Sequence, residues 1–378
     1  MNKSRDSIRN LILIVFSAAA ASVFAADQAK PAGGVPMVAN PIQPRDGVLT
    51  PKLTELWSVG GEKDPGNELL NRPFEVRVTE DGWVYVLDWG DTCIRIFDAK
   101  GKFVRQIGRK GQGPGDFDTP CWFDIDAQGR IYVLDGRNMR VSWFDRDGKF
   151  LGSFRLEKFA DPIRLDRSGR IFCGETTRGT EVLSSEFKKI EQMLNIARYT
   201  PDGKNAIRIG PFPADPIIMK AQGESMVSMS SPVAPKTGWG IDPQGRLWEG
   251  FNGAYELGVF DPDGKPLFRF GREFKPVKNK ALDKLTVQNR KMTTQPEFLP
   301  AFVPDFFFDE KGNAWFRMFR NEDEKGKPYY YDVFSPEGVY LRQIVAPVRI
   351  YQVRNGKMYA IGETEDGFKT LKCYQFQN

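Results

Sequence analysis

The sequence predicts an all-β protein assembled from six similar modules, each made of four short antiparallel strands. The clearest module runs from Pro120 to Phe154, where four short apolar runs alternate with turns rich in Gly, Asp and Asn. Runs this short, bounded by turn-forming residues, favour antiparallel strands over helices. A four-stranded meander cannot bury both of its apolar faces alone, so it needs similar modules on either side.

The other modules repeat this pattern in register. A turn glycine is followed three residues later by an aromatic residue, at Gly82/Tyr85, Gly129/Tyr132, Gly169/Phe172, Gly245/Trp248, Gly312/Trp315 and Gly356/Tyr359. A second aromatic residue precedes the next turn, at Phe97, Phe144, Tyr199, Phe260, Phe334 and Phe376. A fixed repeat with local insertions predicts a six-bladed β-propeller with four-stranded antiparallel blades.

The blades are expected at residues 74–107, 121–154, 163–209, 237–270, 304–345 and 348–376. The last module supplies only three strands before the chain ends. Residues 53–59 (LTELWSV) have the pattern of a fourth strand. We therefore predict a propeller over residues 53–378, in which this N-terminal strand completes the last blade and closes the ring. Closure removes sheet edges that are prone to aggregation.

Residues 1–25 have the pattern of a secretory signal peptide, with a basic start followed by an apolar run from Leu11 to Phe24. A membrane anchor is the alternative, but the apolar run is short for a span. We expect a periplasmic or secreted protein with no stable membrane span. Residues 26–52 are Pro-rich and lack a periodic pattern, which predicts a flexible linker.

The composition excludes several kinds of chemistry. The chain has no histidine, which excludes Ser-His-Asp triads, histidine acid–base catalysis and His-ligated zinc or copper. Its four cysteines are Cys93, Cys121, Cys173 and Cys373. Export permits disulfides, but Cys121 and Cys173 align with apolar core positions of other modules, so small apolar filling is expected instead.

Long insertions are expected at one end of the propeller. In an up-and-down meander, the first and third turns of each blade lie at one end, and these turns are uniformly tight. The second turns and the links between blades lie at the other end, and they contain every long insertion, at residues 175–194, 211–236, 272–303 and 321–327. Binding loops vary in length on rigid scaffolds, so we predict that this end is the working face.

The second module carries a family resemblance. Asp135-Gly136-Arg137-Asn138-Met139-Arg140-Val141, with IYVLD before it and WFDRDGKF after it, resembles an NHL repeat, as does VYVLDWGDTCIRIFDAKGKF in the first module. The Gly-rich link 108–117 is similar to blade connections in exported bacterial six-bladed propellers. The resemblance implies a six-bladed ring but no single activity. The histidines of propeller lyases are absent, and no gluconolactonase-like set of metal ligands is apparent.

Three carboxylates form the candidate metal site. Asp88, Asp135 and Glu175 end the second strands of three adjacent blades, where hard oxygen ligands suit a divalent cation such as calcium. The alternative is structural: the resemblance implies that Asp135 pairs with Arg140. Cys93 replaces this arginine in the first module, which leaves Asp88 without that partner and makes it a ligand-binding candidate.

Further candidates for ligand binding lie near the same end of the blades. They are Trp89, Asp91, Arg137, Asn138, Phe251 and Asn252, beside Asp88 and Glu175. Aromatic residues with arginine suit sugar or peptide recognition, although core packing is the competing explanation for Trp122 and Tyr255. The insertion 272–303 carries seven Lys or Arg and three Asp or Glu. This positive charge predicts either a segment that attracts acidic partners or an ordinary solvated surface.

These observations predict an exported propeller that binds a ligand, or an envelope protein, peptide or glycan partner, on the face with the long loops. The alternative is a metal-dependent hydrolase or lyase with a carboxylate-held cation near the central channel. We expect a monomer that is not an enzyme, needs no cofactor beyond that cation, and binds no nucleic acid.

Overall fold

The computed structural model describes residues 34–61, 69–178, 186–200, 202–204, 206–222, 225–285, 293–319, 326 and 328–377. Strands dominate these ranges, and the helix described within them is one 3₁₀ turn, η1 (Lys280–Lys284). The predicted signal peptide, 1–25, lies outside the described residues. Among the residues described, no helix has the length and apolar character needed to span a membrane.

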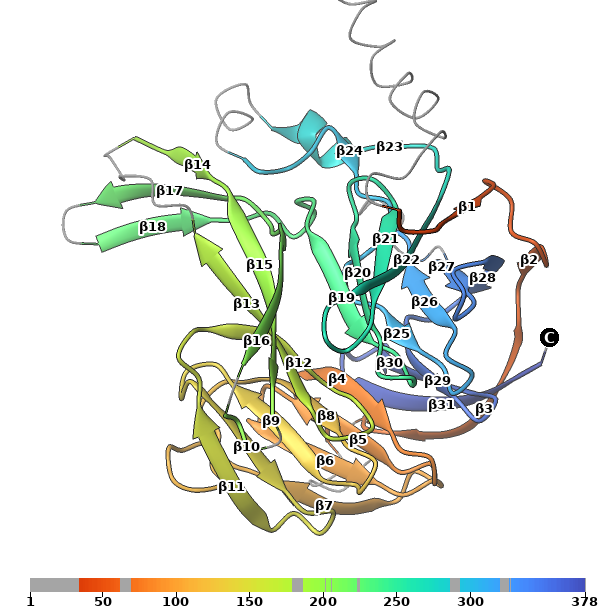
Figure 1. Ribbon diagram of the computed structural model, residues 1–378. Helices are drawn as coiled ribbons and strands as arrows, with labels where there is room; N and C mark the ends of the chain where they lie inside the picture. The colour runs from red at the N-terminus through yellow and green to blue at the C-terminus, as the bar shows by residue number, and fades with distance from the viewer. Residues whose placement is uncertain are drawn as a thin grey trace, which may run out of the picture.

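The chain forms a six-bladed β-propeller (Figure 1). The first three blades follow the predicted bounds closely, and their strands are β4 (Pro73–Val78), β5 (Val84–Asp88), β6 (Cys93–Phe97), β7 (Phe103–Ile107), β8 (Pro120–Ile125), β9 (Ile131–Asp135), β10 (Arg140–Phe144), β11 (Phe150–Arg155), β12 (Ala160–Leu165), β13 (Ile171–Arg178), β15 (Gln192–Tyr199) and β16 (Ile207–Pro213). Each blade is one antiparallel meander, so neighbours in sequence are neighbours in the sheet.

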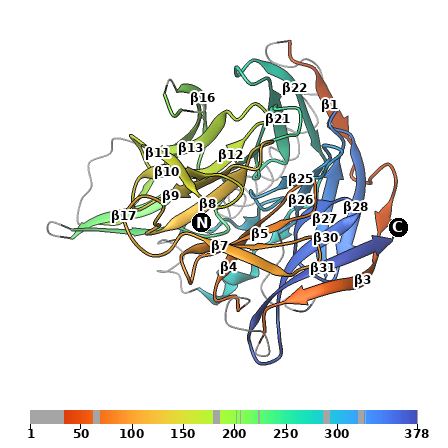
Figure 2. The same cartoon turned by 90° about the horizontal axis from the view of Figure 1, so that it is seen from below.

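Blades four to six show the same order. Their strands are β19 (Thr237–Ile241), β20 (Leu247–Phe251), β21 (Glu256–Phe260), β22 (Pro266–Arg272), β25 (Phe307–Phe308), β26 (Ala314–Arg317), β27 (Tyr329–Phe334), β28 (Tyr340–Ala346), β29 (Ile350–Arg354), β30 (Lys357–Glu363), β31 (Lys369–Gln377) and β3 (Lys52–Val59). The N-terminal strand β3 pairs with β31 as the outer strand of the last blade. Blades one and six lie side by side (Figure 2), and β29 contacts β4.

The prediction of a flexible linker over residues 26–52 is wrong for residues 37–49, which contain two short strands. β1 (Met37–Asn40) pairs in parallel with β22, and β2 (Val48–Leu49) pairs in parallel with β28. The Asn40 side chain donates to the carbonyls of Gly271 and Gly338 and accepts from the Tyr340 amide, which joins blades four and five. Strands this short leave no periodic signal, and only the exposed edges of β22 and β28 order them.

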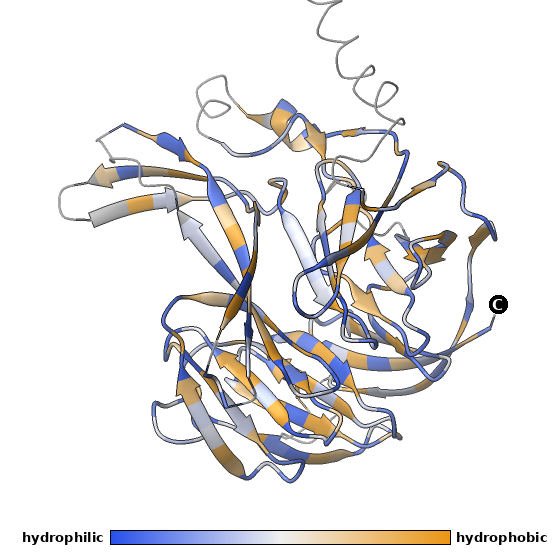
Figure 3. Ribbon diagram, in the orientation of Figure 1, coloured by the Kyte–Doolittle hydropathy of each residue, from blue (hydrophilic) through white to orange (hydrophobic). Residues whose placement is uncertain are grey.

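The repeated aromatic residues form the contacts between blades. Tyr85, Tyr132, Phe172, Trp248, Trp315 and Tyr359 are all buried in the hydrophobic clusters. Hydrophobic residues concentrate on the strands and hydrophilic residues in the turns (Figure 3). Burying one such side chain stabilises the fold by about 1.5–3 kcal/mol. All four cysteines are free, and burial raises the pKa of the Cys93 thiol to about 12.

Two of the predicted insertions fold together. β14 (Lys188–Ile190), from inside blade three, pairs with β17 (Ile217–Gln222), from the link to blade four, and β18 (Ser225–Met229) completes this small sheet. In the next link, β23 (Val277–Lys278) pairs with β24 (Phe298–Leu299). The small sheet projects from blade three (Figure 1). Residues 179–185, 223–224, 286–292, 321–325 and 327 of the predicted insertions lie outside the described residues.

Candidate functional site

Two cavities meet inside the ring. The turn-side cavity, of about 730 Å³, opens among the tight first turns and includes Glu80, Gln128 and Arg167 in its lining. The link-side cavity, of about 1040 Å³, lies among the blade links and long second turns of blades three to five. Their linings share four charged residues, which are Arg164, Asp305, Arg317 and Arg349. The cavities therefore meet at a charged layer in the central channel.

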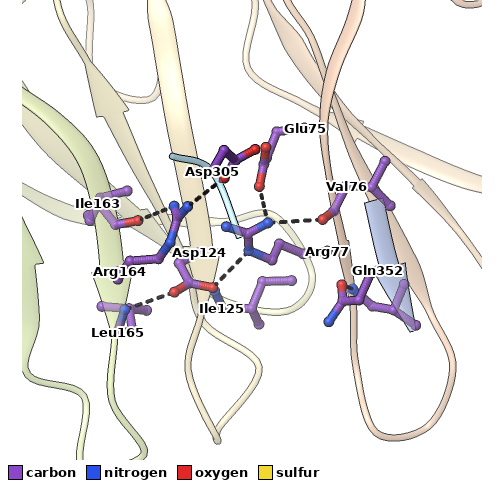
Figure 4. Close-up of polar contacts among 11 residues, drawn as sticks. Glu75, Val76, Arg77, Asp124, Ile125, Ile163, Arg164, Leu165, Asp305 and Gln352 are labelled. Carbon is purple, nitrogen blue, oxygen red and sulfur yellow. Dashed lines mark hydrogen bonds and ion pairs between the residues drawn. The ribbon is translucent and has the colours of Figure 1, made fainter. Parts of the chain in front are cut away.

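Part of this charged layer is internally paired (Figure 4). Arg77, on β4, donates to Glu75 and, at 3.2 Å, to Asp124 on β8. Arg164, on β12, pairs with Asp305 at 3.3 Å and donates to the Ile163 carbonyl at 2.9 Å. Burial raises the pKa of Glu75 although the nearby Arg77 opposes this change. These contacts join the inner strands of the first three blades to the link before blade five.

Arg317 and Arg349 form the unpaired part of the layer. Arg317 ends β26 and Arg349 precedes β29, and both side chains are half-buried. Within the described ranges, no carboxylate lies within 4.0 Å of either guanidinium. Burial and the positive charge of Arg349 lower the pKa of Arg317. Arg349 lies over the Tyr351 ring at 4.4 Å. Two like charges thus share one wall of the channel with no carboxylate of the described chain in direct contact. Burial lowers the pKa of Arg349, but Tyr351 and the more distant Asp305 outweigh this effect and raise it.

The link-side cavity combines these cations with aromatic rings and unused polar atoms. Trp122 lines it beneath the Arg164 guanidinium, 4.9 Å from the ring centroid. Trp239 and Thr237, at the start of blade four, also line it and are 4% and 6% exposed. In the described structure, neither Trp239 Nε1 nor Thr237 Oγ1 has a hydrogen-bond partner. Buried polar atoms are usually paired, so these two atoms are exceptions within the cavity wall.

Asp161 is the titratable acid of this cavity. Its side chain is open to the cavity, but the surrounding protein desolvates it and raises its pKa to about 7. The positive charges of Arg164 and Lys236 oppose this shift. Lys236 itself lies 3.5 Å from Asp215. The charge of the cavity therefore changes near neutral pH.

The sequence-based expectation that Asp88 lacks a partner is wrong. Asp88 is fully buried and accepts hydrogen bonds from the backbone amides of Asn71 and Arg72, at 2.8 and 2.9 Å. It also accepts from Arg95 Nη1 at 2.8 Å. Arg95 lies two residues beyond Cys93 on β6 and therefore on the same face of the strand, so it takes the place of the expected arginine.

The expected pairing of Asp135 with Arg140 is also wrong. Asp135 accepts from the Asp118 and Thr119 amides and from Asn138 Nδ2, at 2.8, 3.0 and 2.8 Å. Arg140 instead donates to carbonyls of the Gly-rich link, including that of Gly113 at 2.9 Å. The Gly-rich link passes close enough for its carbonyls to accept hydrogen bonds from the Arg140 guanidinium. Asp135 is therefore left to accept hydrogen bonds from backbone amides and Asn138.

The remaining buried candidates are also occupied by their own blades. Glu175 accepts from the Tyr199 hydroxyl and from Arg208 Nε, both at 2.7 Å. Asn252 accepts from the Lys236 amide at 2.8 Å and donates to the Phe302 carbonyl at 2.9 Å. No group of three His, Cys, Asp or Glu residues that could hold a metal ion occurs among the residues described. The three proposed metal ligands are thus not brought together.

Other candidates remain accessible at the link side. Trp89 is exposed and carries the Arg72 guanidinium 4.4 Å from its ring centroid. Arg137 is exposed and lies 3.4 Å from Asp118. Asp91 pairs with Arg95 at 2.5 Å, and Phe251 is half-buried. Of the predicted set, Trp89 and Arg137 present the largest free surfaces.

Sequence reasoning missed the residues that line both cavities. Arg164, Arg317 and Arg349 come from blades three, five and six, so no local motif contains them. One signal was available: arginines stand within or beside the short apolar runs of inner strands, as in the IRL of β12 and the VRV of β4. A charged residue in an otherwise apolar inner strand points into the channel.

The fold is shared with other β-propellers. Residues 67–197 match the DUF5128 family, which is described as a 6-bladed β-propeller. No curated protein matches this sequence.

Two solved structures match over nearly their whole length. One is a protein of Bacteroides fragilis named as a candidate exported protein, with 12% identity and a TM-score of 0.55, covering 90% of this chain and 100% of that one. The other is a DUF4221 family member from Bacteroides vulgatus, with 13% identity and a TM-score of 0.53, covering 87% of this chain and 99% of that one. At these identities the likeness shows the fold alone: the chain is a six-bladed β-propeller.

Proposed function

We propose that this protein is an exported binding protein whose link-side cavity takes an anionic ligand. The observation that carries the proposal is the pair Arg317 and Arg349, two half-buried guanidiniums without a carboxylate partner among the described residues. A half-buried charge is costly unless it is paired. A carboxylate or similar anion between the two guanidiniums would offset this cost and accept charge-assisted hydrogen bonds.

The rest of the cavity supports a small organic anion rather than a bare inorganic ion. Its volume of about 1040 Å³ is at the upper end of the usual range for small-molecule sites, about 300–1,000 Å³. The Trp122 ring offers an apolar surface, and Trp239 Nε1 and Thr237 Oγ1 offer unused donors. Arginines give affinity for the charge, and the aromatic and polar groups give orientation.

Titration calorimetry with the mature protein tests this proposal. The probes are succinate, citrate, galacturonate and inorganic phosphate, with uncharged galactose as the neutral match for galacturonate. At least one organic anion should bind, and the double variant Arg317→Gln/Arg349→Gln should lose that binding. Arg105→Gln is the control, because Arg105 pairs with the exposed Asp147 outside both cavities. Absence of binding by every anion, or equal binding by the double variant, would overturn the proposal.

Export is the second part of the proposal. The predicted signal peptide supports it, and one structural neighbour is named as a candidate exported protein. Fractionation of cells that express the full chain should place the processed protein outside the cytoplasm. An unprocessed protein in the cytoplasm would contradict this part and leave the cavity assignment intact.

A further inference from the structure

A row of aromatic side chains extends from the link-side cavity across the first three blades. We call Phe74, Trp89, Trp122 and Phe159 the aromatic track. Phe74, Trp89 and Phe159 are 43%, 38% and 53% exposed, and none of the three packs in a core cluster. The Phe74 ring centroid lies 6.4 Å from that of Trp89 and 5.2 Å from that of Trp122. Exposed aromatic rings grouped in this way mark interaction surfaces.

The track is continuous with the cavity. Trp122 and Phe159 line the cavity, and Phe74 contacts Trp122 from the side of blade one. All four residues come from the ends of strands or links that face the long loops. A ligand that occupies the cavity and extends beyond it would therefore lie on the track.

Guanidinium groups accompany the rings of the track. Arg72 lies over Trp89 at 4.4 Å, and Arg164 lies over Trp122 at 4.9 Å. No carboxylate in the described structure pairs with Arg72. In each pair the guanidinium lies against one face of the ring, so a ligand beside the cation has the other face or the ring edge to contact. A ligand that repeats an apolar ring face and a carboxylate in every unit complements this arrangement in both shape and charge.

Uronic acid residues have these two features in one unit. An apolar face of the sugar ring stacks on an aromatic side chain, and the carboxylate accepts hydrogen bonds from a guanidinium. A peptide backbone would also need acceptors for its N–H groups. The carboxylates nearest the track are already occupied: Asp88 holds backbone amides and Arg95, and Asp91 pairs with Arg95.

We propose that the ligand is an acidic oligosaccharide that contains uronic acids, with one residue at Arg317 and Arg349 and the chain extending over the aromatic track. This inference rests on the proposed function, because it extends the ligand of the same cavity. It adds the class of the ligand and a second set of residues that bind it.

The test measures how affinity depends on ligand length and on the track. The probes are mono- and oligosaccharides of galacturonate, alginate and hyaluronan, with tetraglutamate as an acidic peptide of similar charge. At least one acidic oligosaccharide should bind at least about tenfold more tightly than its monosaccharide. The variants Trp89→Ala and Phe74→Ala should reduce this gain roughly three- to tenfold per ring and leave monosaccharide affinity unchanged.

Trp83→Ala is the matched control. Trp83 also carries an arginine over its ring, with Arg146 at 4.7 Å, but it lies beside a tight first turn at the opposite end of blade one. This variant should keep the full gain from length. Near-ultraviolet circular dichroism and thermal unfolding of each variant confirm that the fold is retained.

The outcomes separate this inference from the proposed function. If small anions bind at Arg317 and Arg349 but no oligosaccharide gains affinity with length, the saccharide inference fails and the cavity assignment stands. Tighter binding of tetraglutamate than of every saccharide also overturns it and points to acidic peptides. Unchanged oligosaccharide affinity in both Trp89→Ala and Phe74→Ala shows that the track is not used.

Discussion

The two ends of the channel differ in how their charged side chains are paired. At the turn side, Asp126, Asp166 and Asp242 each pair with an arginine four residues later, at 2.6 Å in all three cases. Each of these acids also accepts backbone amides of its own turn, so its charge is used locally. At the link side, Arg317 and Arg349 line the channel without such a partner in the described structure.

This difference distinguishes structural charges from functional ones. A pairing repeated in several blades belongs to the blade and recurs wherever the turn recurs. The charges of the link side do not repeat, because they come from three different blades and from links of different length. Residues that break the repeat and stay unpaired are therefore the candidates for ligand recognition.

The largest effect on stability is expected from Asp242→Ala at the turn side. The carboxylate accepts from two backbone amides, Arg246 Nε and Trp248 Nε1, and all four donors would lose their acceptor. We expect the free energy of unfolding to fall by about 3 kcal/mol, with ligand affinity unchanged. Denaturant unfolding measures this loss. The control is Asp261→Ala, a half-buried turn acid of the same blade that holds only backbone amides, where a loss of about 1 kcal/mol is expected.

The second largest effect is expected on anion affinity, from substitutions at the link side. Arg349→Gln and Arg317→Gln should each reduce anion affinity roughly ten- to hundredfold, because each removes one charge-assisted hydrogen bond. The melting temperature should stay the same or rise, because the repulsion between the two guanidiniums is relieved. Calorimetry and thermal unfolding check the two effects separately. A marked fall in melting temperature would mean that these arginines are structural, like those of the turn side.

A smaller effect should appear as pH dependence through Asp161. Burial raises its pKa from 3.8 in the unfolded chain to about 7 in the fold, so the folded state holds the proton more tightly. Its contribution to stability is present in full below about pH 4 and is lost as the pH rises through about 7. Anion affinity should fall over the same upper range, because the deprotonated carboxylate adds negative charge to the cavity. The charged groups that act on it are Arg164 and Lys236, which lower its pKa, and Asp305 and Glu75, which raise it.

Asp161→Asn isolates this effect. At pH 5 the variant and the natural protein should have similar anion affinities, whereas their melting temperatures should become similar only below about pH 4, where Asp161 is protonated in both the folded and the unfolded chain. At pH 8 the variant should be the more stable protein and should bind the anion more tightly. Equal behaviour at both pH values would show that Asp161 is solvated like an ordinary surface acid.

The smallest effect is expected from an exposed ion pair outside the channel. Asp147 is largely exposed and contacts Arg105 at 2.7 Å. Its replacement by Ala should change the free energy of unfolding by less than about 1 kcal/mol, because water screens the pair. A larger loss would show that exposed ion pairs between blades contribute more to the free energy of unfolding than screening by water allows.

The sequence alone determined the fold class, the number of blades and the blade bounds. These features are repeated, and a repeat places a turn glycine and a buried aromatic residue at the same point of every module. The cavity residues were missed for the opposite reason. Arg164, Arg317 and Arg349 are far apart in the sequence, and the one local signal, an arginine within or beside a short apolar run, does not show that they meet.

The tertiary structure decided how the individual side chains are used. Arg95 reaches Asp88 because alternate residues of a strand share one face, and Arg140 takes the carbonyls of the Gly-rich link because the link passes beside it. The segment 37–49 is ordered only because the outer strands of blades four and five leave edges for it to pair with. Periodic hydrophobic burial is encoded locally, whereas the pairing of charges depends on which blades meet in space.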